Sequence, residues 1–117
     1  TSGFGLCVSA EDLAKIGQMC LNKGMYNDKQ IVSSKWIEQI TTPYIKCDEK
    51  FAFMKYGYLW WIIDEKNKIY SAIGDSGNVI YVNTDKNIVI SVTATFKPLV
   101  FDRVQFIQKY IEPFITE

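Results

Sequence analysis

The apolar residues near the start of the chain repeat at helical spacing. Leu13, Ile16 and Cys20 fall on one face of a predicted helix. The helix begins at Ser9, whose hydroxyl can accept a hydrogen bond from a backbone N–H of the first turn, and Gly24 is a natural stop. The pattern therefore predicts an amphipathic helix that lays one side on a core.

A second, shorter helix is predicted after a turn at Asn27-Asp28. Ser33 or Ser34 is the expected N-cap, and the helix should end before Pro43. Its predicted buried residues are Trp36, Ile37 and Ile40.

After residue 55 the pattern changes from a helical repeat to alternation along extended segments. Residues 44–55 carry mixed charges and predict a loop. The following strands are predicted from their aromatic and β-branched residues: Tyr56–Ile63, Ile69–Ile73, Asn78–Asn83 and Ile88–Thr95. Short polar turns at 64–68 and 84–87 indicate antiparallel hairpins.

The chain closes with a predicted helix from about Val100 to Glu112. Its apolar stripe consists of Val100, Val104, Ile107 and Ile111. Such a stripe favours packing across a sheet. We therefore expect one α+β domain over residues 1–117, with two N-terminal helices, an antiparallel meander of about four strands and a covering C-terminal helix.

Charge and composition exclude several classes of function. The 117 residues include 13 basic and 13 acidic side chains, so the net charge is zero. A basic footprint for nucleic acid is absent, and no apolar run approaches the roughly 20 residues that cross a bilayer. We expect neither a nucleic-acid partner nor a membrane span.

The sequence contains no histidine, which removes every mechanism with an imidazole base and all histidine metal sites. Cys7, Cys20 and Cys47 form no Cys-x-x-Cys pair, so no metal or cofactor is expected. Reduced or buried thiols are the favoured interpretation, and a single disulfide stays open as the alternative.

Gly74-Asp75-Ser76-Gly77 spells the sequence around the nucleophile of trypsin-like proteases. That chemistry needs an imidazole, and two glycines around a polar pair serve equally well as a turn. Ser-x-x-Lys would avoid histidine, but no serine of this chain has lysine three residues later. We expect no catalytic residue in the chain itself.

Two further features have both a structural and a functional interpretation. Asp48-Glu49 and Asp64-Glu65 could bind a cation, but neighbouring lysines favour solvated turns. The aromatic run 56–61 could form a stacking platform for sugar or peptide. Alternation favours a core role instead, with Tyr58 and Trp60 on one face and Leu59 and Trp61 on the other.

Taken together, the segments resemble the C-terminal part of the serine β-lactamase and penicillin-binding-protein family, in its class C and esterase-like branch. No single phrase decides this, but the order and spacing match over essentially the whole chain. The phrases are Ser2-Gly-Phe-Gly-Leu6, Ser9–Gly17, Leu21-Asn-Lys-Gly24, Asn27–Ser33, Trp36, Thr41-Thr-Pro43, Tyr56-Gly-Tyr58 with Trp60-Trp61, Ala72–Gly77, Ile80-Tyr-Val82 and Asp85–Val92.

The resemblance implies a serine hydrolase with three motifs, Ser-x-x-Lys, Tyr-x-Asn and Lys/His-Thr/Ser-Gly. The first two precede the region seen here. Tyr81-Val-Asn83 follows the strand motif instead of preceding it, so we interpret it as coincidence. The third motif has a counterpart in the predicted substrate-binding residues Asp75, Ser76 and Gly77.

Within that counterpart, Ser76 could bind a substrate carboxylate or oxyanion. Asp75 stands where the family has a cation or imidazole and would repel an anionic β-lactam, which favours an esterase or peptidase-like relative. The substrate implied is a small molecule or a peptide-like amide or ester.

As a C-terminal portion, the chain alone should be inactive and should lack its N-terminal partner, the rest of the parent hydrolase. An unpaired sheet edge and an apolar helix face then predict self-association. The resemblance suggests a bacterial protein, extracytoplasmic or cytoplasmic. The alternative is a non-catalytic interaction or scaffold module derived from the same fold.

Overall fold

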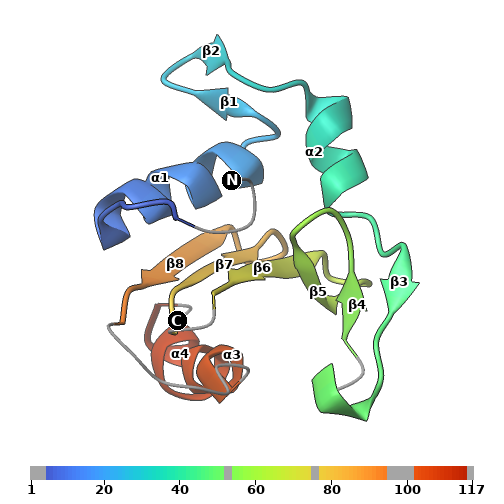
Figure 1. Ribbon diagram of the computed structural model, residues 1–117. Helices are drawn as coiled ribbons and strands as arrows, with labels where there is room; N and C mark the ends of the chain where they lie inside the picture. Colours follow the sequence, from blue (N-terminus) through green and yellow to red (C-terminus); the bar gives the residue numbers. More distant parts are fainter. Residues whose placement is uncertain (1–4, 52–53, 75–76, 95–101, 116–117) are drawn as a thin grey trace.

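A computed structural model describes residues 5–51, 54–74, 77–94 and 102–115. It is an α+β fold in which a six-stranded antiparallel sheet lies between helices (Figure 1). Helices α1 and α2 lie on one side of the sheet, and the C-terminal helix covers the other. The predicted fold class is confirmed. Among the described residues, no helix is long and apolar enough to cross a membrane.

The N-terminal elements follow their sequence signals. Helix α1 spans Ala10–Leu21, and the Ser9 hydroxyl accepts from the Asp12 backbone N–H at 3.1 Å. Helix α2 spans Ser34–Ile40, and Ser33 is its N-cap. Between them, β1 (Met25–Tyr26) and β2 (Lys29–Gln30) form a small hairpin around the predicted turn. Both helices and both caps are confirmed because local chemistry determines them.

The large sheet is a meander whose strands lie in sequence order. The order is β3-β4-β5-β6-β7-β8, and each neighbouring pair is antiparallel. The strands are β3 (Ile45–Lys46), β4 (Lys55–Tyr56), β5 (Trp61–Asp64), β6 (Ile69–Ile73), β7 (Val79–Asn83) and β8 (Ile88–Val92). A 3₁₀ turn, η1 (Glu49–Phe51), lies between β3 and β4.

The predicted single strand Tyr56–Ile63 is wrong, because the chain reverses within it. The Gly57 N–H donates to the Trp60 carbonyl at 2.8 Å, and this hairpin loop joins β4 to β5. Leu59 adopts φ +65° in the loop. Alternation therefore breaks down: Trp60 is buried, whereas Tyr58 and Leu59 are both exposed.

Two other expectations also need correction. The loop predicted at 44–55 contains β3 and η1. Together with the division of the predicted strand 56–63 into β4 and β5, this gives the sheet six strands instead of four. Trp36, expected in the core, is 46% exposed. Only Ile37 of α2 is fully buried, because a two-turn helix presents a narrow face to the sheet.

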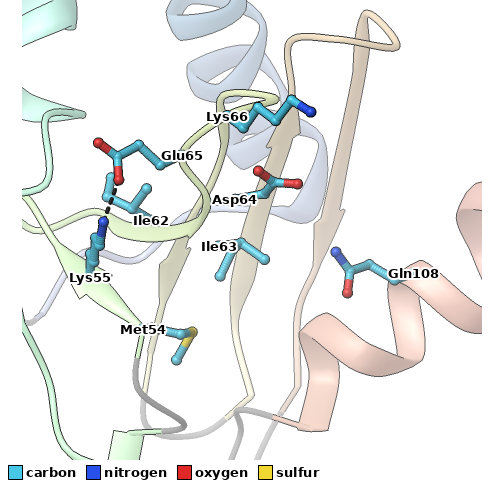
Figure 2. A pocket seen from close by; sticks show the side chains of 8 residues that line it. All are labelled: Met54, Lys55, Ile62, Ile63, Asp64, Glu65, Lys66 and Gln108. Atoms are coloured by element: carbon cyan, nitrogen blue, oxygen red, sulfur yellow. Dashed lines mark hydrogen bonds and ion pairs between the residues drawn. The ribbon is translucent and has the colours of Figure 1, made fainter.

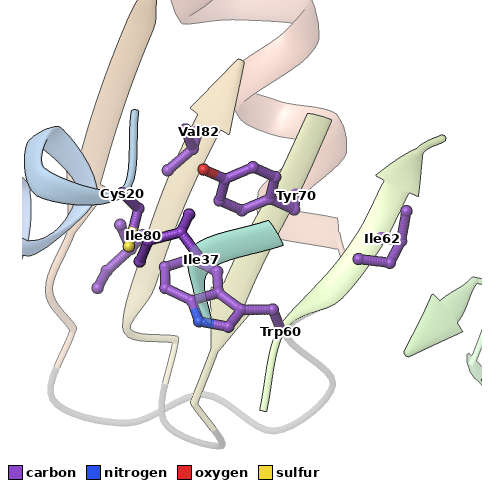
Figure 3. Packing of buried hydrophobic residues seen from close by; sticks show 7 residues of the cluster. All are labelled: Cys20, Ile37, Trp60, Ile62, Tyr70, Ile80 and Val82. Carbon is purple, nitrogen blue, oxygen red and sulfur yellow. The ribbon is translucent and has the colours of Figure 1, made fainter. Parts of the chain in front are cut away.

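The core is divided into two clusters by the sheet. The first lies under α1 and α2 and consists of Cys20, Ile37, Trp60, Ile62, Tyr70, Ile80 and Val82 (Figure 3). Helix α1 approaches the sheet closely at Gly17, where an added Cβ would lie 2.5 Å from Val89 Cγ1. Burial raises the pKa of Cys20 to about 11. Cys7, Cys20 and Cys47 are all free.

The second cluster lies under the C-terminal helix, which runs as α3 (Asp102–Phe106), the π-helical segment η2 (Ile107–Ile111) and α4 (Glu112–Ile115). Val104 and Ile107 are buried and Ile111 is half-buried, so this part of the predicted stripe is confirmed. Val100 lies outside the described residues. The helix continues to Ile115, past its predicted end.

A buried carboxylate ties the C-terminal helix to the sheet. Glu112 accepts from the Tyr81 hydroxyl at 2.7 Å and from Asn83 Nδ2 at 3.0 Å, and its Oε1 lies 2.9 Å from Lys86 Nζ. Burial alone would raise the pKa of Glu112, but the bonds from Lys86 and Tyr81 outweigh it and lower that pKa. Tyr81 and Asn83 thus have a structural role, in agreement with the interpretation of their spacing as coincidence.

Candidate functional site

The predicted substrate-binding residues fall at the turn between β6 and β7. Asp75 and Ser76 lie outside the described residues, so their assignment stays a prediction. Gly77 is described and buried, with φ +94°. Left-handed backbone of this kind favours glycine. The described residues around this turn therefore define the candidate site.

The C-terminal helix places the single arginine of the sequence against Gly77. A Cβ added to Gly77 would lie 3.4 Å from Nε and 3.5 Å from Nη2 of Arg103, and 3.1 Å from Ala94 Cβ. Nε of Arg103 is buried and has no hydrogen-bond partner among the described residues. A guanidinium is always charged and only donates, so the turn has beside it a cation whose Nε bonds no group in the described part of the chain.

Strand β6 has an open edge at the same turn. The Gly74 N–H donates to the Asn78 carbonyl at 2.8 Å, so strand alternation directs the N–H and C=O of Ile73 away from β7. On that side β5 begins only at Trp61, which pairs with Ser71. Within the described part of the chain, no strand pairs with Ile73 there.

The open edge of β6 and the nearby Arg103 guanidinium can each bind a different part of a ligand. The unpaired donor and acceptor of Ile73 can pair with the amide backbone of an extended molecule, as in β-strand addition. The Arg103 guanidinium can bind an anionic group at the end of the same molecule. This part of the chain can therefore bind and orient an extended amide.

Four of the five described serines, all but Ser34, use their hydroxyls in structural hydrogen bonds. Ser71 is buried and donates to the Ile80 carbonyl at 2.8 Å, and Ser91 donates to the Ala10 carbonyl at 2.5 Å. Ser9 and Ser33 cap helices. Each of these four hydroxyls is already used structurally, in keeping with the absence of Ser-x-x-Lys from the sequence.

The acidic pairs behave as turn residues. The carboxylate of Asp64 accepts from the backbone N–H of Asn67 at 3.1 Å and from its Nδ2 at 2.7 Å, and these bonds lower the pKa of Asp64. Asp48 accepts from the Lys50 N–H. The described residues contain no group of three metal-ligating side chains. The interpretation of both pairs as solvated turns is supported.

A surface recess of about 800 Å³ lies beside β5 and the C-terminal helix (Figure 2). An ion pair between Lys55 and Glu65 closes one side, and Gln108 faces the recess from the helix. It lies at the Asp64 end of β5, whereas the open edge lies at the Trp61 end. The recess is therefore separate from the candidate site.

Sequence reasoning placed Gly77 at a pocket wall but missed Arg103 and Ile73. The helical stripe gave no reason to select Arg103, because the contact with Gly77 depends on how the helix lies on the sheet. Ile73 reads as an ordinary strand residue, and its open edge depends on where β5 begins. Neither residue carried a local signal that could have revealed its place.

The α+β fold of this chain resembles part of a β-lactamase-like hydrolase fold. The solved structure described as "Putative 6-aminohexanoate-dimer hydrolase from Bacillus anthracis" matches 91% of this chain, with a TM-score of 0.68 and 26% sequence identity. The match spans 28% of that longer chain. No family model matches the sequence, and no curated protein matches it.

Proposed function

We propose that the chain is the C-terminal portion of a β-lactamase-like serine hydrolase of the class C, esterase-like branch, and that it forms one wall of the acyl pocket. The observation that carries this proposal is the open edge of β6 at Ile73, beside the turn that contains Gly77 and that Arg103 of the C-terminal helix contacts. The likeness to a larger hydrolase supports it, since the chain spans 28% of that structure.

The reaction proposed for the whole enzyme is acyl transfer to a serine in another part of the protein. The serine oxygen attacks the carbonyl carbon of an amide or ester, and its proton passes to a general base. The bond from that carbon to nitrogen or oxygen breaks, and the amine or alcohol leaves with a proton. Water then hydrolyses the acyl-enzyme. The isolated chain is proposed to be inactive.

Three features of this chain would orient the substrate. The backbone of Ile73 pairs with the substrate amide, the hydroxyl of Ser76 bonds its carboxylate or oxyanion, and Arg103 binds an anionic end. The Asp75 carboxylate disfavours β-lactams, whose carboxylate lies close to the reacting carbonyl, so we propose a linear amide or ester whose anionic group is at its end, where Arg103 binds it. The name of the Bacillus anthracis structure, which refers to the dimer of 6-aminohexanoate, agrees with a linear amide.

The first test is the intact mass of this chain after incubation with a reactive penicillin and with an activated ester. We expect no adduct, while the full-length hydrolase should gain one acyl group from the ester. A stoichiometric adduct on a serine of the isolated chain would contradict the proposed division of roles. Absence of any adduct on the full-length protein would favour the scaffold alternative.

The second test uses variants of the full-length protein. Arg103→Gln should raise KM for an amide with a free carboxylate about tenfold, because a charge-assisted hydrogen bond is lost, and should leave KM for a neutral ester unchanged. Lys109→Gln, on the exposed side of the same helix, is the matched control. Ser76→Val should slow acylation, and an unchanged rate would remove Ser76 from the pocket.

A further inference from the structure

Three exposed aromatic side chains gather beside the candidate site. Trp36 of α2, Tyr44 of the following segment and Tyr58 of the β4–β5 loop are 46%, 51% and 50% exposed. The rings of Tyr44 and Tyr58 stack with centroids 4.8 Å apart and planes 14° apart, and the centroids of Trp36 and Tyr58 are separated by 6.0 Å. These three residues are named here the aromatic surface.

The β4–β5 loop, which carries Tyr58, contains a residue in an unfavourable backbone conformation. Leu59, next to Tyr58, has φ +65° and is 59% exposed. A left-handed conformation is unfavourable for a side chain with a Cβ, and residues of this kind concentrate at ligand-binding positions. The Leu59 side chain is mostly exposed, so its burial contributes little to the stability of the fold. Folding alone therefore does not account for a leucine at this position.

The aromatic surface is held rigidly. The Tyr58 N–H donates to the Ile40 carbonyl at the end of α2, at 2.9 Å. Gly57 lies so close to α2 that an added Cβ would be 2.2 Å from the Ile40 carbonyl oxygen. The loop and the helix end are therefore fixed to each other, and a ligand would meet a surface that is already ordered.

Strand register places the aromatic surface at the end of the sheet that carries the open edge. Trp61 pairs with Ser71 in antiparallel register, so the residues before Trp61 lie toward Ala72 and Ile73. Trp60 and Ala72 belong to the same packed cluster, which confirms this placement. Helix α2 lies on the α1 side of the sheet, so the aromatic surface borders that side of the edge.

We propose that the aromatic surface binds an apolar or aromatic side group of the extended amide whose backbone pairs with Ile73. This inference rests on the proposed function, because it specifies the substrate class of the same site. In an extended ligand, side groups alternate between the two sides, so every second one is directed to the α1 side. Stacking on Tyr58 then selects ligands with a ring or a bulky apolar group at that position.

The test compares two blocked peptides on the 117-residue chain, acetyl-Ala-Phe-Ala-amide and acetyl-Ala-Ala-Ala-amide. Dissociation constants come from titrations followed by the backbone amide signals of Ile73 and Tyr58 in NMR spectra. We expect both peptides to shift Ile73, only the phenylalanine peptide to shift Tyr58, and the phenylalanine peptide to bind about fivefold more tightly.

Tyr58→Ala should abolish the preference for phenylalanine and leave the dissociation constant of the alanine peptide unchanged. Tyr110→Ala is the matched control, because Tyr110 is a similarly exposed tyrosine (54%) on the C-terminal helix. Tyr44→Leu, which removes one ring and keeps an apolar side chain, is the second variant if Tyr58→Ala does not fold. A preference that survives both surface variants overturns the inference.

The outcomes separate this inference from the proposed function. Equal affinity for the two peptides, with Ile73 shifted by both, supports the edge and overturns the aromatic surface. Shifts at Tyr58 with a phenylalanine preference, but none at Ile73, support the aromatic surface and contradict the edge. Binding by neither peptide overturns both.

Discussion

At the scale of single residues, Leu59 combines two unfavourable properties. Its backbone lies in the left-handed region, and its apolar side chain is 59% exposed. The other described non-glycine residues with positive φ are all polar or charged: Lys23, Asn27, Asp28, Lys68 and Asn87. Leu59 is the apolar residue of this group, so a substitution there can relieve the backbone conformation without removing a polar turn residue.

Leu59→Gly should stabilise the fold by about 0.5–1 kcal/mol, because glycine adopts positive φ without a Cβ clash. This net gain is smaller than the relief of the clash, since glycine also loses more backbone entropy on folding. The free energy of unfolding in urea measures the change. Leu59→Ala keeps the Cβ and is the control, so an equal gain in both variants would show that the side chain, not the backbone, is responsible.

At the scale of elements, the C-terminal helix depends on one buried carboxylate. The Glu112 side chain is 7% exposed and accepts hydrogen bonds from the sheet residues Tyr81 and Asn83. Glu112 directly follows the π-helical segment η2, and its backbone N–H donates to the Ile107 carbonyl. The Glu112 side chain thus holds the helix on the sheet at the end of its irregular segment.

Glu112→Gln should destabilise the fold by about 2 kcal/mol, because hydrogen bonds to a buried charge are replaced by weaker ones. Urea unfolding at pH 7 measures the loss. Glu65→Gln breaks the exposed ion pair with Lys55 and should cost less than about 1 kcal/mol. Equal losses in the two variants would contradict the structural role of Glu112.

The same carboxylate gives a pH dependence. Its pKa is lowered in the folded state, so its stabilisation is complete above the unfolded pKa of about 4.3 and is lost as the pH falls below it. The stability difference between the wild-type chain and Glu112→Gln should therefore shrink as the pH falls from about 5 through the lowered, folded-state pKa of Glu112. A constant difference across that range would be inconsistent with a lowered pKa.

Local chemistry made most elements predictable, and tertiary contacts decided the rest. Ser9 and Ser33 capped the helices as expected, and the strands after residue 68 followed their alternation. The reversal between β4 and β5 could not be predicted, because the aromatic run 56–61 has the composition of one continuous strand. The reversal depends on the close approach of Gly57 to the end of α2. For the site, Gly77 was predictable as a turn, whereas Arg103 and Ile73 gain their roles only from packing.

At the scale of the whole molecule, many large hydrophobic side chains lie outside the two cores and are exposed. Exposed rings on the C-terminal helix repeat at four-residue spacing, at Phe106, Tyr110 and Phe114, and form a stripe on its outer side. Contiguous exposed apolar surface of this kind indicates a partner. In a larger hydrolase the rest of the chain would be that partner, and in the isolated chain a second copy can replace it.

The isolated chain should therefore self-associate, and its light-scattering mass should rise with concentration. Phe114→Lys, at an 81% exposed position, should lower the mass by placing a charge in the stripe. Tyr44→Lys is the control, because it charges the aromatic surface instead. A strictly monomeric mass at high concentration, or a loss of association only in Tyr44→Lys, would contradict the role of the helix stripe.

The sequential order of the strands has a consequence for how the chain folds. Each strand of the meander pairs with the next one along the chain, so the sheet can form hairpin by hairpin without long loops to close. Helix α1 is different, because it packs on β7 and β8 at the other end of the sequence, with the Ser91 hydroxyl bound to the Ala10 carbonyl. During synthesis α1 must therefore wait for β7 and β8, and it remains without its packing surface until about 70 further residues have been made.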